Sequence, residues 1–287
     1  MWVSDKWEDY RLLDAADGYR LERWGTHVLV RPDPQVIWKT ARRHSRWNTP
    51  DAKYTRSSDG GGSWTKHKLP EHWTVGYGGL SFQVKPMNFK HTGLFPEQAV
   101  NWDAMRQLIE KRARREKPFK VLNLFAYTGA ATMACAAAGA QVTHVDAAKG
   151  MVAWARENAA LSKLEARWII DDCAAFVARE FRRGNRYDGI VLDPPSYGRG
   201  PSGEVWKLEE NLFPLLEQVV SLLSDDAQFL FLNSYTTGLA PGVLAVMLDL
   251  LVKPRFGGRV EAGELGLPVD ATGVILPCGA TGRWIQS

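Results

Sequence analysis

Residues 119–146 read FKVLNLFAYTGAATMACAAAGAQVTHVD, and this stretch decides the fold. An apolar run at 119–125 leads into a turn that contains glycine, an alanine-rich stretch near 129–138 favours a helix, and a second apolar run covers 141–145. Two strands that are joined by a helical crossover lie parallel in one sheet. The stretch therefore predicts an α/β fold.

The same alternation continues to the C-terminus. We expect further helices near 149–163, 173–183, 208–223 and 241–251, and further strands near 166–170, 187–192, 227–233, 259–262 and 272–285. With the two strands above, this makes seven strands, and the last two are expected to close the sheet as an antiparallel hairpin. The fold class that we predict is a Rossmann-like, doubly wound α/β sheet with helices on both faces.

The region before residue 90 has a different pattern. Short aromatic-rich runs at 19–24, 27–31, 73–77 and 80–85 are separated by glycine and proline, which is typical of short strands. We therefore predict a small β-rich N-terminal domain over residues 1–89 and a second domain over residues 90–287. Several of the twelve tryptophans fall in the first domain, where we favour a role in the core of a small sheet over stacking on RNA bases.

Composition bears on the partner, the metal content and the location of the protein, but it does not identify a function. The chain has 287 residues, 36 Lys and Arg against 32 Asp and Glu, and a net charge of +4, which suits a nucleic-acid partner only mildly. Its three cysteines show neither close pairing nor metal-ligand spacing, so we expect neither disulfides nor a metal site. No apolar run is long enough to predict a membrane span, and no signal core precedes Tyr10, so we expect the protein in the cytoplasm.

Candidate binding residues follow directly after the predicted strands. In an open parallel sheet, ligands bind outside the carboxyl ends of the strands. The turn after the first strand comprises Phe125, Ala126, Tyr127, Thr128 and Gly129. Its small residues would let the backbone approach a ligand closely, and the helix that follows would offer free N–H groups to a carboxylate. An ordinary tight turn between strand and helix is the alternative.

Two carboxylates follow the next two strands. Asp146, with Ala147 after it, lies seventeen residues beyond Gly129, a separation that suits a carboxylate accepting hydrogen bonds from two ribose hydroxyls. This spacing fits a nicotinamide cofactor equally well. Asp172 can accept a hydrogen bond from an adenine amino group, although Asp is also a favoured residue at a helix N-cap.

The sharpest signal is a stiff corner at Asp193-Pro194-Pro195-Ser196-Tyr197. Two consecutive prolines fix the backbone and extend neither strand nor helix. Asp193 can hold the protons of an amine, and Tyr197 can cover the face of a base. A simple strand terminator is the alternative.

Four segments resemble the class I S-adenosylmethionine-dependent methyltransferases, a family that includes the bacterial large-subunit (23S) ribosomal RNA methyltransferases acting on cytosine C5 or guanine N7. The segments are LNLFAYTG (122–129), VDAAKGMVAWAREN (145–158), WIIDDCAAF (168–176) and LDPPSYGRG (192–200). The resemblance covers about His91 to the C-terminus. It implies S-adenosyl-L-methionine as cofactor, S-adenosyl-L-homocysteine as product, and RNA, in particular large-subunit ribosomal RNA, as partner.

The resemblance also implies roles for single residues. HTGLFPEQ (91–98) resembles the family's loop before the sheet, so Phe95, Pro96 and Gln98 are expected to line the pocket for the methionine part of the cofactor. The turn 125–129 would hold the methionine end, Asp146 the ribose and Asp172 the adenine.

Two departures from the family pattern concern the acceptor. The N-terminal region does not resemble the RNA-binding PUA module that many members possess. Cytosine C5 becomes nucleophilic only after a cysteine thiolate adds to the ring, and residues 233–238, after the fifth strand, contain no cysteine. We therefore favour a nitrogen acceptor. The glycine-rich residues 198–207 are either a loop that faces the substrate or a linker.

Four classes of function remain open on this sequence. They are an RNA methyltransferase, a methyltransferase for a protein or small-molecule amine or amide, a nicotinamide-dependent oxidoreductase and a non-catalytic RNA-binding relative. The oxidoreductase has the least support, because no G-x-G-x-x-G follows the first strand. We expect a monomer or a homodimer.

Overall fold

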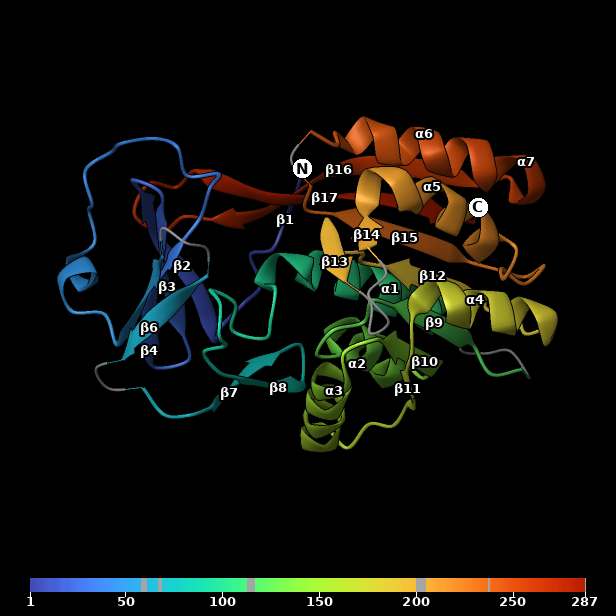
Figure 1. The fold of residues 1–287 in the computed structure, drawn as a ribbon, viewed down its shortest axis with the longest axis horizontal. Coiled ribbons are helices and arrows are strands. Elements are labelled where there is room, and N and C mark those ends of the chain that lie inside the picture. The colour runs from blue at the N-terminus through green and yellow to red at the C-terminus, as the bar shows by residue number, and fades with distance from the viewer. Residues whose placement is uncertain (58–60, 67–68, 113–116, 200–204, 237, 287) are drawn as a thin grey trace. The chain divides into compact units, whose positions relative to one another are not determined.

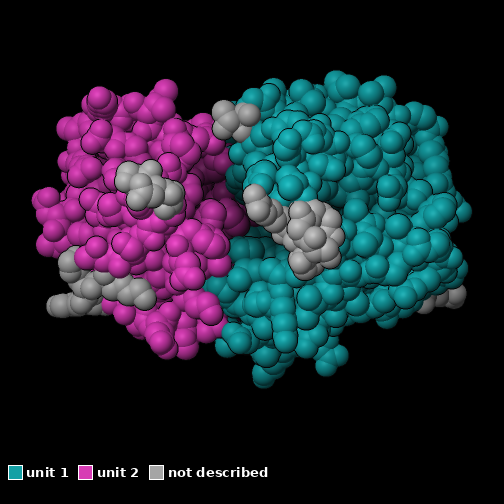
Figure 2. All heavy atoms as spheres, viewed as in Figure 1, with its two compact units in different colours: residues 1, 100–264, 279–287 teal, residues 2–99, 265–278 magenta. Residues whose placement is uncertain are grey.

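The computed structural model describes residues 1–287 except 58–60, 67–68, 113–116, 200–204, 237 and 287. The chain divides into two compact units (Figure 2). Unit 1 comprises residues 1, 100–264 and 279–287, and unit 2 comprises residues 2–99 and 265–278. Among the described residues, no helix combines the length and the apolar character that crossing a membrane requires.

Most strands of unit 1 belong to a mixed sheet (Figure 1). Its strand order is β1-β16-β17-β15-β12-β9-β10-β11. The bounds are β1 Trp2–Val3, β9 Lys120–Leu124, β10 Gln141–Asp146, β11 Arg167–Ile170, β12 Gly189–Leu192, β15 Phe229–Ser234, β16 Arg259–Pro268 and β17 Ile275–Ile285. Strands β9 to β12 and β15 pair in parallel, and β17 runs antiparallel to β15. The predicted doubly wound sheet is confirmed, and β1 adds an eighth strand by pairing with β16 at Leu265 and Gly266.

The strand order reverses at β9. From β9 the chain passes to β10 and β11 on one side, and then to β12 and β15 on the other. The point where the order reverses is the switch point at which ligands bind in open α/β sheets. The carboxyl ends of β9 and β12 therefore flank the expected crevice.

Helices cover both faces of this sheet. They are α1 Ala99–Arg112, α2 Ala130–Ala137, α3 Lys149–Leu161, α4 Cys173–Arg182, α5 Leu208–Val220, α6 Pro241–Leu251 and the short α7 Lys253–Phe256. Helices α4, α5 and α6 pack with the buried strands into one large apolar core. Helix α2 contacts α1 and α3. Because both faces are covered, β9, β12 and β15 are almost entirely buried and apolar, as in parallel sheets generally.

Unit 2 is rich in strands, as predicted for the N-terminal region. Its five-stranded sheet has the order β2 Tyr10–Ala16, β3 Tyr19–Trp24, β4 His27–Pro32, β5 Ala52–Arg56 and β6 Gly62–Lys66. A separate hairpin pairs β7 Trp73–Tyr77 with β8 Leu80–Val84. Trp7, Trp24 and Trp47 are buried, which confirms the core interpretation for these three.

A buried ion pair stabilises the β-sheet of unit 2. Glu22 is fully buried and accepts hydrogen bonds from Arg31 at 2.5 and 2.7 Å and from the Tyr10 hydroxyl at 2.8 Å. Burial is the largest single influence and raises the pKa of this carboxyl, but Arg31, Arg20 and the Tyr10 hydroxyl together lower the pKa below its ordinary value. The network satisfies a charge that would otherwise be costly to bury.

Candidate active site

Four strand ends meet at the switch point. Leu124 of β9 pairs with Leu192 of β12 and with Val145 of β10, and Asp146 of β10 pairs with Ile170 of β11. Apart from Phe95, Pro96 and Gln98, the residues that the sequence singled out lie at these positions or directly after them. The structure therefore brings the turn 125–129, Asp146, Asp172 and Asp193 to one edge of the sheet.

The turn after β9 has an unusual backbone. Phe125 and Tyr127 have φ angles of 54° and 51°, and Gly129 has φ 86°. Residues other than glycine rarely occupy this region, at a cost of about 1–3 kcal/mol each, and such strain clusters at ligand sites. At Gly129 a Cβ atom would lie 2.9 Å from the Cβ of Ala155, so glycine allows α2 to begin against α3. This is more constrained than an ordinary tight turn.

Two backbone N–H groups hold the Asp146 carboxylate in place. Its Oδ2 accepts a hydrogen bond from the Tyr127 N–H at 2.9 Å, and its Oδ1 accepts one from the Ala148 N–H at 2.8 Å. Each carboxylate oxygen has two acceptor positions, so each retains one for a ligand hydroxyl. Burial raises the pKa of this half-buried carboxyl despite the two backbone donors. Ala147, which lies between Asp146 and Ala148 in the sequence, is exposed.

Asp172 begins helix α4. Its side chain accepts a hydrogen bond from the Ala175 N–H at 2.8 Å, so the N-cap interpretation is confirmed. One cap bond leaves acceptor capacity on the exposed carboxylate, so contact with an adenine remains compatible with this role. The neighbouring Asp171 is paired with Arg179.

The proline corner is clamped from two sides. The Trp206 Nε1 donates to the Pro195 carbonyl at 2.6 Å, and the Thr236 hydroxyl donates to Ser196 Oγ at 2.6 Å. Pro194 is buried, whereas Tyr197 is 55% exposed. The Asp193 N–H lies 3.4 Å from the Leu124 carbonyl, so the corner starts beside the turn 125–129.

The described residues of the glycine-rich stretch after this corner form two short paired strands. Strand β13 Tyr197–Arg199 pairs antiparallel with β14 Val205–Lys207, and residues 200–204 lie outside the described residues. The Trp206 ring is 5.2 Å from the Phe125 ring, centroid to centroid. The hairpin thus connects the proline corner to the turn after β9.

All three cysteines are buried and free. Burial raises the pKa of Cys135 to about 12 and raises the pKa of Cys173 and Cys278 further still. A thiol nucleophile requires the thiolate. With their thiols protonated, all three pack as small, weakly polar groups.

The predicted methionine-pocket residues Phe95, Pro96 and Gln98 belong to unit 2. Within that unit, the Pro96 carbonyl accepts hydrogen bonds from Ser4 Oγ at 2.8 Å and from Trp7 Nε1 at 2.9 Å. Their role beside the cofactor stays a prediction.

Sequence reasoning missed a buried polar chain under the turn 125–129. Asn123 Nδ2 donates to the Thr132 hydroxyl at 2.9 Å, and that hydroxyl lies 3.0 Å from His144 Nδ1. Burial lowers the pKa of His144 to about 3, so the ring is neutral at physiological pH. An isolated His in an apolar strand gives no local signal for this packing.

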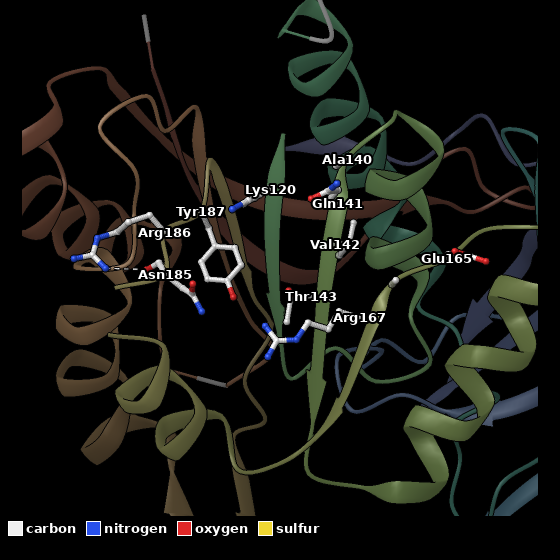
Figure 3. A pocket seen from close by; sticks show the side chains of 11 residues that line it. Lys120, Ala140, Gln141, Val142, Thr143, Glu165, Arg167, Asn185, Arg186 and Tyr187 are labelled. Atoms are coloured by element: carbon white, nitrogen blue, oxygen red, sulfur yellow. Dashed lines mark hydrogen bonds between the residues drawn. The ribbon is translucent and has the colours of Figure 1, made fainter. Parts of the chain in front are cut away.

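A hollow lies at the opposite ends of the parallel strands (Figure 3). It has a volume of about 500 Å³, and Lys120, Gln141 and Arg167 line it from the amino ends of β9, β10 and β11. Two of its lining side chains, Tyr187 and Asn185, donate hydrogen bonds to the buried Glu180 at 2.6 and 2.8 Å. The convergence of predicted residues is at the carboxyl edge, which we take as the candidate active site.

Comparison with known proteins identifies the family. The model of the S-adenosylmethionine-dependent methyltransferase family matches residues 37–229. The chain belongs to this family. A crystal structure of a SAM-dependent methyltransferase from Agrobacterium tumefaciens is 36% identical with a TM-score of 0.92, and the alignment covers 100% of this chain and 93% of that one.

Curated relatives of this methyltransferase are named ribosomal RNA large subunit methyltransferase K/L. The protein from Pseudoalteromonas atlantica is 34% identical over 160 residues, which is 54% of this chain and 21% of the relative. The protein from Methylococcus capsulatus is 34% identical over 210 residues, 71% of this chain and 26% of the relative. The chain therefore spans about a fifth to a quarter of the length of these relatives.

The residues present fit the family's cofactor, S-adenosylmethionine. Asp146 retains two acceptor positions, which matches the two hydroxyls of a ribose. The left-handed turn 125–129 lies at the N-terminus of α2, where backbone N–H groups suit a carboxylate.

Proposed function

We propose that this protein transfers the methyl group of S-adenosylmethionine to a base nitrogen of large-subunit ribosomal RNA. The observation that carries the proposal is the convergence of the turn 125–129, Asp146 and the Asp193 corner at the switch point of a methyltransferase-family sheet. The names of the curated relatives support RNA as the acceptor.

The chain's residues would hold the cofactor at three places. The turn 125–129 would bind the carboxylate of the methionine part, Asp146 the ribose hydroxyls, and Asp172 the adenine. Phe95, Pro96 and Gln98 would line the methionine pocket. When bound, the cofactor supplies an activated methyl group on a sulfonium. The protein would therefore contribute mainly by placing the acceptor in line with that group.

The acceptor would be held by the Asp193 corner. Pro194 and Pro195 fix the backbone, and hydrogen bonds from Trp206 and Thr236 clamp the corner. The Asp193 carboxylate would accept hydrogen bonds from the acceptor nitrogen, and the exposed Tyr197 ring would cover a base face. A nitrogen can attack directly, whereas cytosine C5 needs a thiolate, and burial raises the pKa of all three cysteines.

The direct test is transfer of a labelled methyl group from S-adenosylmethionine. RNA, protein and metabolite fractions come from a strain that lacks the gene, so that the natural site is unmethylated. We expect label in large-subunit ribosomal RNA and none with Asp193→Ala, whose cofactor affinity stays within a few-fold of wild type because this residue orients the acceptor.

The other outcomes separate the alternatives. Label confined to protein or metabolites would reject RNA and favour an amine or amide acceptor. Tight cofactor binding without transfer to any fraction would favour a non-catalytic RNA-binding relative. Gel filtration would show whether the protein is a monomer or a homodimer, and fractionation would test the expected cytoplasmic location.

A further inference from the structure

Unit 2 carries a concentrated positive charge. Residues 37–56, which we call the basic segment, contain six cations and one carboxylate, a net charge of +5. The cations are Lys39, Arg42, Arg43, Arg46, Lys53 and Arg56. Since the whole chain has a net charge of +4, the rest of the chain sums to −1. The mild basicity of the protein therefore resides in twenty residues.

The basic segment is a surface feature. It runs from the end of the first β-hairpins through the short helix Ser45–Asn48 to β5, along the light blue loop in Figure 1. Lys39, Arg42 and Arg43 are exposed, and Ile37 is 83% exposed. These side chains are accessible to a partner.

The backbone of the basic segment is held in shape by one buried carboxylate. Asp14 of β2 is 1% exposed, and its Oδ2 accepts hydrogen bonds from the N–H groups of Arg43 at 2.8 Å and His44 at 3.3 Å. The same oxygen accepts one from the Trp47 Nε1 at 2.8 Å. A buried carboxylate is costly unless it is satisfied. Most of the groups that donate hydrogen bonds to Asp14 belong to the basic segment. These hydrogen bonds therefore fix the backbone conformation of the segment around Arg43.

Aromatic rings lie among these cations. The Arg42 guanidinium is 4.7 Å from the Trp47 ring centroid and 5.9 Å from that of Tyr19, and the Lys53 ammonium is 5.3 Å from the Tyr19 ring. Arg42 keeps 42% of its side chain exposed while it lies over these rings. RNA-binding proteins use guanidinium planes and aromatic rings to stack bases, and cations to neutralise phosphates.

Besides the buried Asp14, two carboxylates oppose the cations locally. Asp17 is 3.8 Å from Arg42, and Asp51 is 2.9 Å from Arg46. Lys39, Arg43 and Arg56 are three exposed cations outside these pairs, and Lys53 is a half-buried one. The segment therefore keeps a positive excess after its own ion pairs are counted.

We infer that the basic segment, with Tyr19, binds the RNA strand of the substrate through its phosphates and through base stacking on Arg42. This inference rests on the proposed function for the identity of the RNA. It gives unit 2 a role in retaining the substrate.

The test measures binding of an unmodified transcript of large-subunit ribosomal RNA between 50 and 200 mM KCl. One variant combines Lys39→Gln, Arg42→Gln and Arg43→Gln. The matched control combines Arg156→Gln, Lys163→Gln and Arg182→Gln in unit 1, which removes the same charge from other exposed positions. Each phosphate contact contributes about −0.7 to the slope of log K against log salt. We therefore expect the slope of the first variant to be shallower than that of wild type by about 2. Between 50 and 200 mM KCl, the affinity of wild type should then fall roughly sixteen-fold more than that of the variant.

Equal slopes for wild type and the first variant, or an equal loss in the control, would overturn the inference. Methyl-transfer assays with the same proteins separate it from the proposed function. A raised KM for RNA with unchanged kcat would support both. An unchanged KM on RNA that is methylated would reject the RNA-binding segment alone. Segment-dependent RNA binding without transfer to RNA would reject the proposed function alone.

Asp14→Asn provides a second test of the presented backbone. It adds one unit of positive charge, so simple electrostatics predicts tighter RNA binding. Loss of the anchoring carboxylate predicts weaker binding with all six cations retained. Tighter binding by a variant of unchanged melting temperature would show that the backbone shape of the segment contributes nothing.

Discussion

Gly129→Ala should destabilise the protein through two separate costs. The backbone at Gly129 has φ 86°, and placing a Cβ there costs roughly 1–2 kcal/mol. The new Cβ would also lie 2.9 Å from the Cβ and 3.4 Å from the Cα of Ala155, an overpacking that costs about 1–3 kcal/mol. We therefore expect a loss of about 2–5 kcal/mol in the free energy of unfolding, measured by urea denaturation, together with weaker S-adenosylmethionine binding by calorimetry.

Gly139→Ala is the matched control. Gly139 has φ 93°, but a Cβ there meets no atom within 4 Å, so this variant pays only the backbone cost and keeps its cofactor affinity. Adding Ala155→Gly to Gly129→Ala removes one of the clashing atoms and should recover part of the packing cost as a coupling energy. Equal losses for Gly129→Ala and Gly139→Ala, with no recovery in the double variant, would refute close packing of α2 against α3 as the reason for glycine.

Three further predictions concern single ionisable groups. Asp146→Ala should weaken cofactor binding by roughly 1–3 kcal/mol. In calorimetry, the cofactor affinity of wild type should fall as the pH drops through the pKa of Asp146, which is raised above the ordinary 3.8. The affinity of the variant should show no such fall. Glu22→Ala should cost about 3–5 kcal/mol of stability in urea denaturation, because it leaves Arg31 as an uncompensated buried charge, and a loss below 1 kcal/mol would contradict this. The pKa of His144 is about 3 in the folded state and 6.5 ordinarily, so between these pH values only the unfolded chain binds a proton at this residue. His144 should therefore lower the free energy of unfolding by up to about 1.4 kcal/mol per pH unit as the pH falls from 6.5 towards 3. Denaturation curves of His144→Gln across this range should show a shallower pH dependence.

The parallel strands were predictable because their signal is local. Strands β9, β12 and β15 are buried on both faces, so each is a mainly apolar run. The candidate site was predictable for the same reason, since its residues follow directly after these runs. Once the strand ends are known, parallel pairing places Asp146 and Asp193 at the edge that also holds the turn 125–129.

Features that depend on distant pairing were not predictable. Trp2 and Val3 form a strand only because residues 265–266 pair with them. The β13–β14 hairpin lies in a glycine-rich stretch whose local pattern is that of a loop, and Trp206 fixes it through the Pro195 carbonyl. The positive φ angles of Phe125 and Tyr127 likewise have no sequence signal, because these residue types rarely adopt them.

The distribution of charge bears on how the two units share the work. Unit 1, which carries the candidate active site, has 21 Lys and Arg against 20 Asp and Glu, so its net charge is only +1. RNA affinity depends largely on neutralising phosphates, and by the inference above the basic segment of unit 2 supplies cations for this. The proposed chemistry at Asp193 depends on the orientation of one base, not on contacts along a long RNA strand. Changes in the basic segment should therefore alter KM for RNA, whereas changes at the proline corner should alter kcat, and the two effects should be additive in a combined variant.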